Sequence, residues 1–281
     1  MSAIPLLRLL VAGVSTMTLV PLVSLVFVYN TKPDIIIKAI RKAVIWRAGL
    51  TVKFVTVDGY RFAYGERGRP SETQPSILFL HGFSTSKDTW ARFITALPRN
   101  LHIITLDLPG HGESDRNPNQ DLSMEGQANT VHRFVDALGL DQKPFHLVGT
   151  SMGGGIAGLY AATYRKNIAL LTLFCPFGVL TPVYSYTMKA FLEGRNMLVP
   201  KTMDDFREMM KINSYQYKIG KLKVPDKVFD VSGADILREG VPNCRLDILD
   251  DCGHVVTVER TQQAVAVFMN FREEVLNGYK K

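Results

Sequence analysis

The sequence predicts an α/β fold with a mostly parallel, doubly wound sheet that is covered by helices on both faces. Short apolar runs typical of buried strands occur at residues 76–80, 102–106, 145–148 and 168–174. Segments that suit helices alternate with these runs. The run at 145–148 leads directly into Gly149-Thr150-Ser151-Met152-Gly153, and small and apolar residues follow. These observations give a strand–turn–helix unit at the centre of the chain.

This central turn fits the pattern G-x-S-x-G, and its setting between a strand and a helix is that of a nucleophile elbow. The serine of such a turn has a strained backbone. The residues two before and two after it must be very small, because a Cβ there would collide with the neighbouring strand and helix. The helix directs its N-terminal N–H groups at the serine. The pattern predicts Ser151 as a nucleophile; the alternative is a glycine-rich turn that holds a serine by chance.

Composition excludes several classes of protein. The chain has 281 residues and a formal net charge of +7, without a run of five or more basic residues or a zinc-finger spacing. The charge fits attraction to anionic lipid headgroups at least as well as binding to nucleic acid. The three scattered cysteines, Cys175, Cys244 and Cys252, argue against a disulfide framework and a zinc site. We expect free thiols in a reducing compartment, and no metal or organic cofactor.

The N-terminal region predicts a membrane anchor. After a short tail at residues 1–8, residues 9–29 carry no charge and are long enough to cross a bilayer as a helix. A cleaved signal peptide is the main alternative, but its apolar region would be shorter. A soluble core helix fits less well, because no polar face appears at helical spacing. In the secreted alternative the mature chain would lack this segment.

Residues 30–50 form the next predicted segment. Isoleucines and valines alternate there with lysines and arginines, which is typical of a basic amphipathic helix on a membrane surface, although a helix that packs on the domain is the alternative. Before the predicted span only Arg8 is basic, whereas several basic residues follow it. The positive-inside rule therefore places the C-terminal side in the cytoplasm.

The remaining residues, 51–281, are predicted to form the catalytic domain. Residues 53–57 and 61–64 suit a hairpin around Asp58-Gly59, and Ser123 is placed to cap a helix. Residues 176–224 are rich in methionine and aromatic residues and suit a lid over the site, or else ordinary core helices. We expect a strand at 245–249 and a closing helix at about 259–275.

The base and the acid should follow the serine in the chain. His254 lies just past the predicted strand at 245–249, in a turn with acidic neighbours, which is where the base is expected; a surface loop histidine is the alternative. The candidates for the acid are Asp226, Asp230, Asp235 and Asp247, and Asp226 leads on local grounds. The loop after the strand at 76–80 should supply an oxyanion-hole N–H, which position assigns to Phe83. His81 in the same loop could act as a base, but we expect it to be structural and to hold the loop by hydrogen bonds.

At this point the chain resembles the α/β-hydrolase superfamily and, within it, the membrane-anchored monoacylglycerol lipases. The stretches that carry the resemblance are residues 75–84, 107–111, 143–154, 230–235 and 252–254. The resemblance implies a triad and an oxyanion hole, formed by Ser151, His254 and Asp226 and by the N–H groups of Phe83 and Met152. It also implies hydrolysis of monoacylglycerols, including 2-arachidonoylglycerol, with lysophospholipids as secondary substrates, and a location on late endosomal, lysosomal and other intracellular membranes.

The chain departs from this family in one place. The family has a longer stretch between serine and acid, including an apolar strand that delivers the acid, whereas here Lys221-Leu222-Lys223-Val224-Pro225 leads straight into Asp226. This departure resembles an internal deletion. It leaves a second hypothesis, a membrane-anchored binding protein that keeps the fold but has lost catalytic power. The oligomeric state is not predicted.

Overall fold

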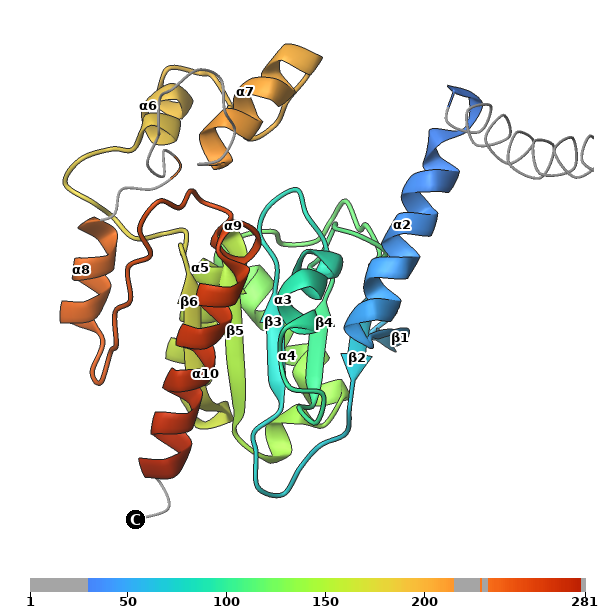
Figure 1. Ribbon diagram of the computed structural model, residues 1–281, viewed down its shortest axis with the longest axis vertical. Helices are drawn as coiled ribbons and strands as arrows, with labels where there is room; N and C mark the ends of the chain where they lie inside the picture. Colours follow the sequence, from blue (N-terminus) through green and yellow to red (C-terminus); the bar gives the residue numbers. More distant parts are fainter. Residues whose placement is uncertain (1–29, 215–227, 229–231, 279–281) are drawn as a thin grey trace, which may run out of the picture. The chain divides into compact units, whose positions relative to one another are not determined.

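The computed structural model describes residues 30–214, 228 and 232–278 (Figure 1). The chain divides into two compact units, one ending at Trp46 and the other starting at Arg47. Helix α2 (Pro33–Ala48) coincides with the predicted basic segment, and its Trp46 is 81% exposed. The predicted span at 9–29 lies outside the described residues. Within the described ranges, no helix combines the length and the apolar character that a bilayer crossing needs.

A sheet of six strands forms the centre of the second unit (Figure 1). The strands are β1 (Thr51–Val57), β2 (Tyr60–Arg67), β3 (Ile77–Leu80), β4 (Ile103–Leu106), β5 (Phe145–Thr150) and β6 (Ile168–Phe174). Their order is β1-β2-β4-β3-β5-β6. β1 and β2 pair antiparallel, as do β2 and β4, whereas β4, β3, β5 and β6 are parallel. The predicted mostly parallel sheet is confirmed.

The predicted hairpin is also confirmed. Val57 pairs with Tyr60, so the turn contains only Asp58 and Gly59. Their φ angles are 50° and 77°. Two consecutive positive φ values suit the tight turns whose twist matches that of the flanking strands, and aspartate followed by glycine tolerates them well.

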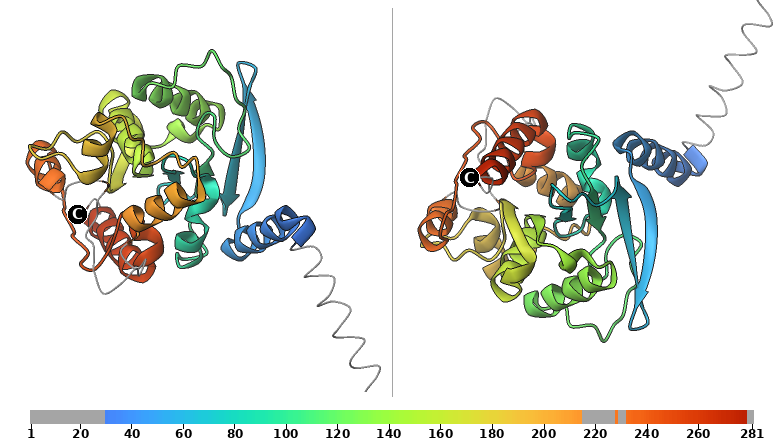
Figure 2. Two further views of the ribbon diagram at one scale, coloured as in Figure 1. Left: turned by 90° about the horizontal axis from the view of Figure 1, so that it is seen from above. Right: turned by 90° about the horizontal axis from the view of Figure 1, so that it is seen from below.

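The helices of the second unit cover both faces of the sheet (Figure 2). They are α3 (Ala91–Thr95), α4 (Met124–Ala137), α5 (Met152–Thr163), α6 (Tyr186–Leu192), α7 (Met203–Asn213), α8 (Ser232–Gly240), α9 (Val256–Glu259) and α10 (Thr261–Gly278). The Ser123 side chain accepts a hydrogen bond from the Gly126 N–H at 3.0 Å, so the predicted cap of α4 is confirmed. The predicted closing helix corresponds to α10.

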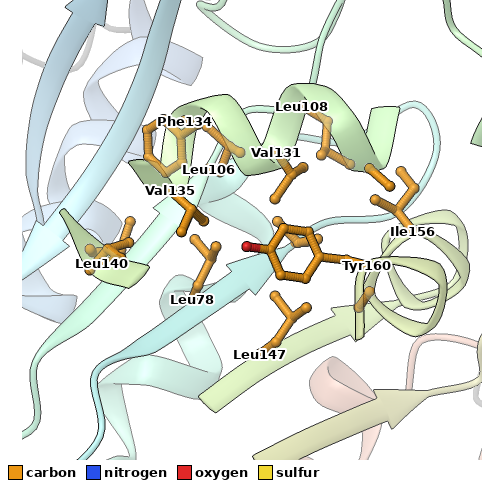
Figure 3. Close-up of a cluster of buried hydrophobic side chains, with 14 of the residues drawn as sticks. Leu78, Leu106, Leu108, Val131, Phe134, Val135, Leu140, Leu147, Ile156 and Tyr160 are labelled. Carbon is orange, nitrogen blue, oxygen red and sulfur yellow. The ribbon is translucent and has the colours of Figure 1, made fainter. Parts of the chain in front are cut away.

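Alternate residues of β3 build two hydrophobic cores, one on each face of the sheet. Leu78 and Leu80 belong to the cluster under α4 and α5, which Figure 3 shows with Tyr160 at its centre. Phe79 points to the other face, where its ring lies 4.7 Å from that of Trp90 and 6.2 Å from that of Phe268 in α10. Figure 2 shows the helices of the two layers on opposite sides of the sheet.

A buried arginine attaches α10 to the sheet. Arg272 donates from Nη2 to the Pro75 carbonyl at 2.7 Å and from Nη1 to Nδ1 of His146 at 3.2 Å. Because Nδ1 of His146 accepts, its Nε2 carries the proton and donates to Oγ1 of Thr172 at 2.8 Å. Burial lowers the pKa of Arg272 to about 10, so the side chain stays charged at neutral pH. This chain of contacts joins α10, β5 and β6.

The predicted strand at 245–249 is wrong. These residues have no regular secondary structure, and Ile248 is 60% exposed. A strand requires a neighbour for its backbone groups. In the described part of the sheet β6 is the last strand, and it pairs with β5 alone. Residues 245–249 therefore have the apolar pattern of a strand, but the described residues contain no neighbouring strand with which they pair.

Candidate active site

Ser151 occupies a sharp turn between β5 and α5. Its φ of 53° and ψ of −121° form a strained combination for a residue with a side chain. The backbone around it is fully bonded: its N–H donates to the Phe174 carbonyl at 3.0 Å, and its carbonyl accepts from the N–H groups of Gly155 at 3.1 Å and Phe177 at 2.9 Å. The end of β6 and the start of the next segment thus hold the serine in this conformation.

The turn requires glycine at positions 149 and 153, because backbone atoms of neighbouring segments come very close to both residues. A methyl group on Gly149 would lie 2.2 Å from the Gly153 carbonyl oxygen. A methyl group on Gly153 would lie 2.4 Å and 2.5 Å from the carbonyl oxygens of His81 and Leu80. All three distances are far below van der Waals contact, so no larger residue fits. The end of β3 therefore lies directly against the turn, as the sequence pattern predicts.

The loop after β3 also approaches the serine. A methyl group on Gly82 would lie 3.2 Å from Cβ and 3.7 Å from Oγ of Ser151. Phe83 is the next residue in this loop. On the other side, Met152 begins α5, where a helix has N–H groups without a partner in the helix itself. The structure thus places Gly82, the residue before Phe83, and the start of α5 beside Ser151, and the oxyanion roles of Phe83 and Met152 stay predictions.

The Gly82–Phe83 peptide is held in one orientation. The Gly82 carbonyl accepts from Nδ1 of His81 at 2.7 Å and from Oγ1 of Thr85 at 2.8 Å. No cis peptide occurs among the described residues, so the N–H of Phe83 points opposite to this carbonyl. His81 can bind in this way because its Nε2 accepts from the Leu108 N–H at 3.0 Å, which leaves the proton on Nδ1.

His81 is therefore a structural residue rather than a base. Burial lowers its pKa to about 4, so the imidazole is neutral at physiological pH. The neutral ring joins the loop after β3 to the loop after β4. This agrees with the sequence-based expectation that the histidine following β3 supports the loop by hydrogen bonds.

His254 lies in the loop before α9 and is buried, with 8% of its surface exposed. The loop is tied on both sides: Glu259 accepts from the Gly253 N–H at 2.8 Å, and the Val255 N–H donates to the Asn213 carbonyl at 3.3 Å. The second bond joins the end of α7 to this loop. His254 is thus a buried residue and not a surface loop histidine, and its pairing with Ser151 stays a prediction.

The candidate acids fall into two groups. Asp226 and Asp230 lie outside the described residues, so the structure places neither of them. Asp235, on α8, forms an ion pair with Arg238 at 3.1 Å, and Asp247 forms one with Arg245 at 2.9 Å. The partner of both described aspartates is therefore an arginine, and the assignment of Asp226 stays a prediction.

A buried ionic cluster lies beside the site, and the sequence interpretation missed it. Nζ of Lys87, which ends the loop after β3 and begins a short 3₁₀ helix, lies 2.7 Å from Oδ2 of Asp107, which follows β4. Asp107 directly follows the buried strand β4, and a charged residue at the carboxyl end of such a strand is the signal that would have revealed it. Within the described ranges, no group of three or more histidine, cysteine or acidic side chains is arranged to hold a metal ion.

The chain belongs to the α/β-hydrolase fold family, whose model matches residues 75–214. It is 35% identical to the human monoacylglycerol lipase ABHD6 over 289 aligned positions, covering 83% of this chain and 86% of the relative. Together with the hydrolase structures below, this identifies the chain as a serine ester hydrolase, and the relatives support lipid esters as the broad class of substrate.

Solved structures agree with this assignment. A membrane phospholipase A described as a bacterial virulence factor superposes with a TM-score of 0.81 at 28% identity, covering 96% of this chain and 99% of that one. A lipase structure from Acinetobacter baumannii gives a TM-score of 0.76 at 25% identity, covering 86% of this chain and 97% of that one.

The alignment with the human relative also supports a missing segment. The share of this chain that is aligned, 83% of 281 residues, is about 233 residues, and the 289 aligned positions exceed this by about 56. The relative thus has residues at positions where this chain has none. This agrees with a sheet that, in the described residues, ends at β6.

Replacement of Gly153 by alanine tests the contact between the turn and β3. We expect Gly153→Ala to lose the reactivity of Ser151 and to lower the free energy of unfolding by at least about 2 kcal/mol, because the methyl group meets backbone atoms that cannot move aside. Urea unfolding and labelling by a fluorophosphonate measure the two effects.

Gly158→Ala is the matched control in the same helix. A methyl group there meets nothing within 4 Å, so alanine should leave labelling intact and stabilise the protein by up to about 1 kcal/mol. If the two variants have the same free energy of unfolding and the same labelling, the packing described for the turn would be contradicted.

Proposed function

We propose that the chain hydrolyses monoacylglycerols at a membrane surface, with Ser151 as the nucleophile, His254 as the base and Asp226 as the acid that orients it. The observation that carries the proposal is the strained Ser151 beside Gly82, with the Gly82–Phe83 peptide fixed by His81 and Thr85. The relatives named monoacylglycerol lipases support the choice of ester.

The proposed reaction has two acyl-transfer steps. His254 takes the proton of the Ser151 hydroxyl, and Ser151 attacks the ester carbonyl. The N–H groups of Phe83 and Met152 stabilise the negative charge that develops on the carbonyl oxygen, an effect of about 3–4 kcal/mol for each donor. His254 then protonates the leaving glycerol and activates a water molecule, which releases the fatty acid from Ser151.

The described part of the lid, residues 176–214, supports a lipid substrate. Large apolar side chains are exposed there, on α6 and α7 and in the segment before them, and they include Leu180, Tyr184, Phe191, Leu192 and Met203. A lid of this kind suits acyl chains, since a water-soluble substrate would gain nothing from exposed apolar surface. Lysophospholipids, which share one acyl chain and one ester, are proposed as secondary substrates.

We also propose that residues 9–29 anchor the chain, with residues 30–50 on the membrane surface and the catalytic domain on the cytoplasmic side, in late endosomes, lysosomes or other intracellular membranes. The apolar length and the basic residues that follow it support this arrangement. Deletion of residues 9–29 should move the protein from the carbonate-resistant membrane pellet to the supernatant. An intact chain that alkaline carbonate extracts would contradict the anchor.

Two observations favour a second function, that of a binding protein with impaired catalysis. Residues 245–249, which precede His254, form no strand, and the aligned relative has about 56 positions that this chain lacks. A triad without its acid loses about 10⁴ in rate. In this alternative the lid binds lipid, but hydrolysis at Ser151 is too slow for the protein to act as an enzyme.

Labelling of membranes that express the chain with a fluorophosphonate probe separates the two functions. We expect the wild-type chain to be labelled and to release fatty acid from a monoacylglycerol, and Ser151→Ala to do neither. Asp226→Asn should lose labelling and reduce hydrolysis by about 10⁴. Ser71→Ala, which changes a serine in the loop between β2 and β3, is the control and should behave as wild type.

The remaining outcomes decide between the alternatives. If Asp226→Asn is labelled as strongly as wild type, either another acid, such as Asp230, orients His254 or no acid does. A folded wild-type chain that resists the probe would refute the proposed hydrolysis and favour the binding protein.

A further inference from the structure

Two members of the ionic cluster beside the site, Lys87 and Asp107, are almost completely buried, whereas the side chain of Glu113 is 41% exposed. Lys87 is 1% exposed and Asp107 is fully buried. Nζ of Lys87 lies 2.7 Å from both Oδ2 of Asp107 and Oε2 of Glu113, and 4.0 Å from Oδ1 of Asp88. Burying an ammonium and a carboxylate costs several kilocalories per mole before they pair, so such a cluster is a weak means of stabilising a fold.

Asp107 also binds the backbone of two loops. Its Oδ1 accepts from the N–H of Lys87 at 2.7 Å, and its Oδ2 accepts from the N–H of Glu113 at 2.9 Å. A methyl group on Gly112 would lie 2.2 Å from this carboxylate, so the loop after β4 wraps closely around it. One carboxylate thus joins the loop after β3 to the loop after β4.

The loop after β3 is therefore fixed at both ends. At its start, the neutral imidazole of His81 binds the Leu108 N–H and the Gly82 carbonyl. At its end, the Lys87 backbone and side chain both bind Asp107. Between these points lies Phe83, whose N–H is the proposed oxyanion donor. An N–H group stabilises the transition state most when it already points at the developing charge. If it must reorient during the reaction, part of that stabilisation is lost.

We propose that Lys87 and Asp107 are positioning residues for the ester hydrolysis: their buried ion pair aims the Phe83 N–H at the oxyanion. They touch neither substrate nor reacting atoms and act through the loop. The inference rests on the proposed function, since it takes Ser151 as the nucleophile and Phe83 as a donor. It assigns to the cluster a kinetic role in addition to any contribution to stability.

The test uses the full chain in membranes and the double variant Lys87→Met/Asp107→Asn. This pair of changes removes the two most buried charges together, and the carboxylates that remain, Glu113 and Asp88, have side chains that are 41% and 16% exposed. We measure kcat and KM on 4-nitrophenyl butyrate, with the concentration of reactive sites determined by fluorophosphonate titration so that unfolded molecules do not count. Lys143→Met is the matched control, because Lys143 pairs with Glu72 on the exposed surface.

We expect kcat per titrated site to fall about 10- to 100-fold in the double variant, part of the loss seen when an oxyanion donor is removed, with KM within about twofold of wild type. The inhibition constant of an aliphatic trifluoromethyl ketone, whose adduct carries an oxyanion, should rise by the same factor. Binding of butyrate, which forms no such adduct, should not change. Lys143→Met should match wild type in all three measurements.

Two results would overturn the inference. If the double variant is less stable but keeps the kcat and the ketone affinity of wild type at each titrated site, the cluster is structural only. If KM rises while kcat is unchanged, the cluster affects substrate binding instead. A wild-type chain that shows neither labelling nor turnover would refute the proposed function and, with it, the positioning role. This outcome is distinguishable from failure of the positioning role alone, because it is observed in the wild-type chain without any variant.

Discussion

The contact between the turn at Ser151 and the end of β3 is the constraint on which the rest of the site depends. Gly153 lies so close to the His81 and Leu80 carbonyls that the turn permits no side chain there. The same contact places the loop after β3 beside the serine before any substrate binds. The strain at Ser151, on the order of 1–3 kcal/mol, persists because bonds from β6 and from the segment after it hold the serine in place.

Local chemistry explains which features the sequence predicts well. The hairpin at Asp58-Gly59, the cap at Ser123 and the turn at Ser151 each depend on a few adjacent residues whose side chains favour one backbone conformation. His81 was also interpreted correctly as structural. Its hydrogen bond to the Leu108 N–H, however, joins residues from two strands and is visible only in three dimensions.

Features that depend on distant partners were missed. Residues 245–249 have the pattern of a strand, but a pattern supplies no neighbour, and in the described residues the sheet ends at β6. The sequence does not predict the ion pair of Lys87 and Asp107, because charged residues in loops are usually exposed, whereas these two are buried. In the described residues, the strands and loops around Ser151 form a continuous sheet, whereas the segment that leads to His254 adds no strand to it.

The central claim is that the turn at Ser151 and the two backbone donors are already arranged for an oxyanion. A crystal structure of the chain after reaction with a fluorophosphonate tests this most directly. We predict phosphorus bonded to Oγ of Ser151, with the phosphoryl oxygen about 2.7–3.1 Å from the N–H nitrogens of both Phe83 and Met152. Phosphorus on another side chain, or a phosphoryl oxygen directed away from these two groups, would contradict the account.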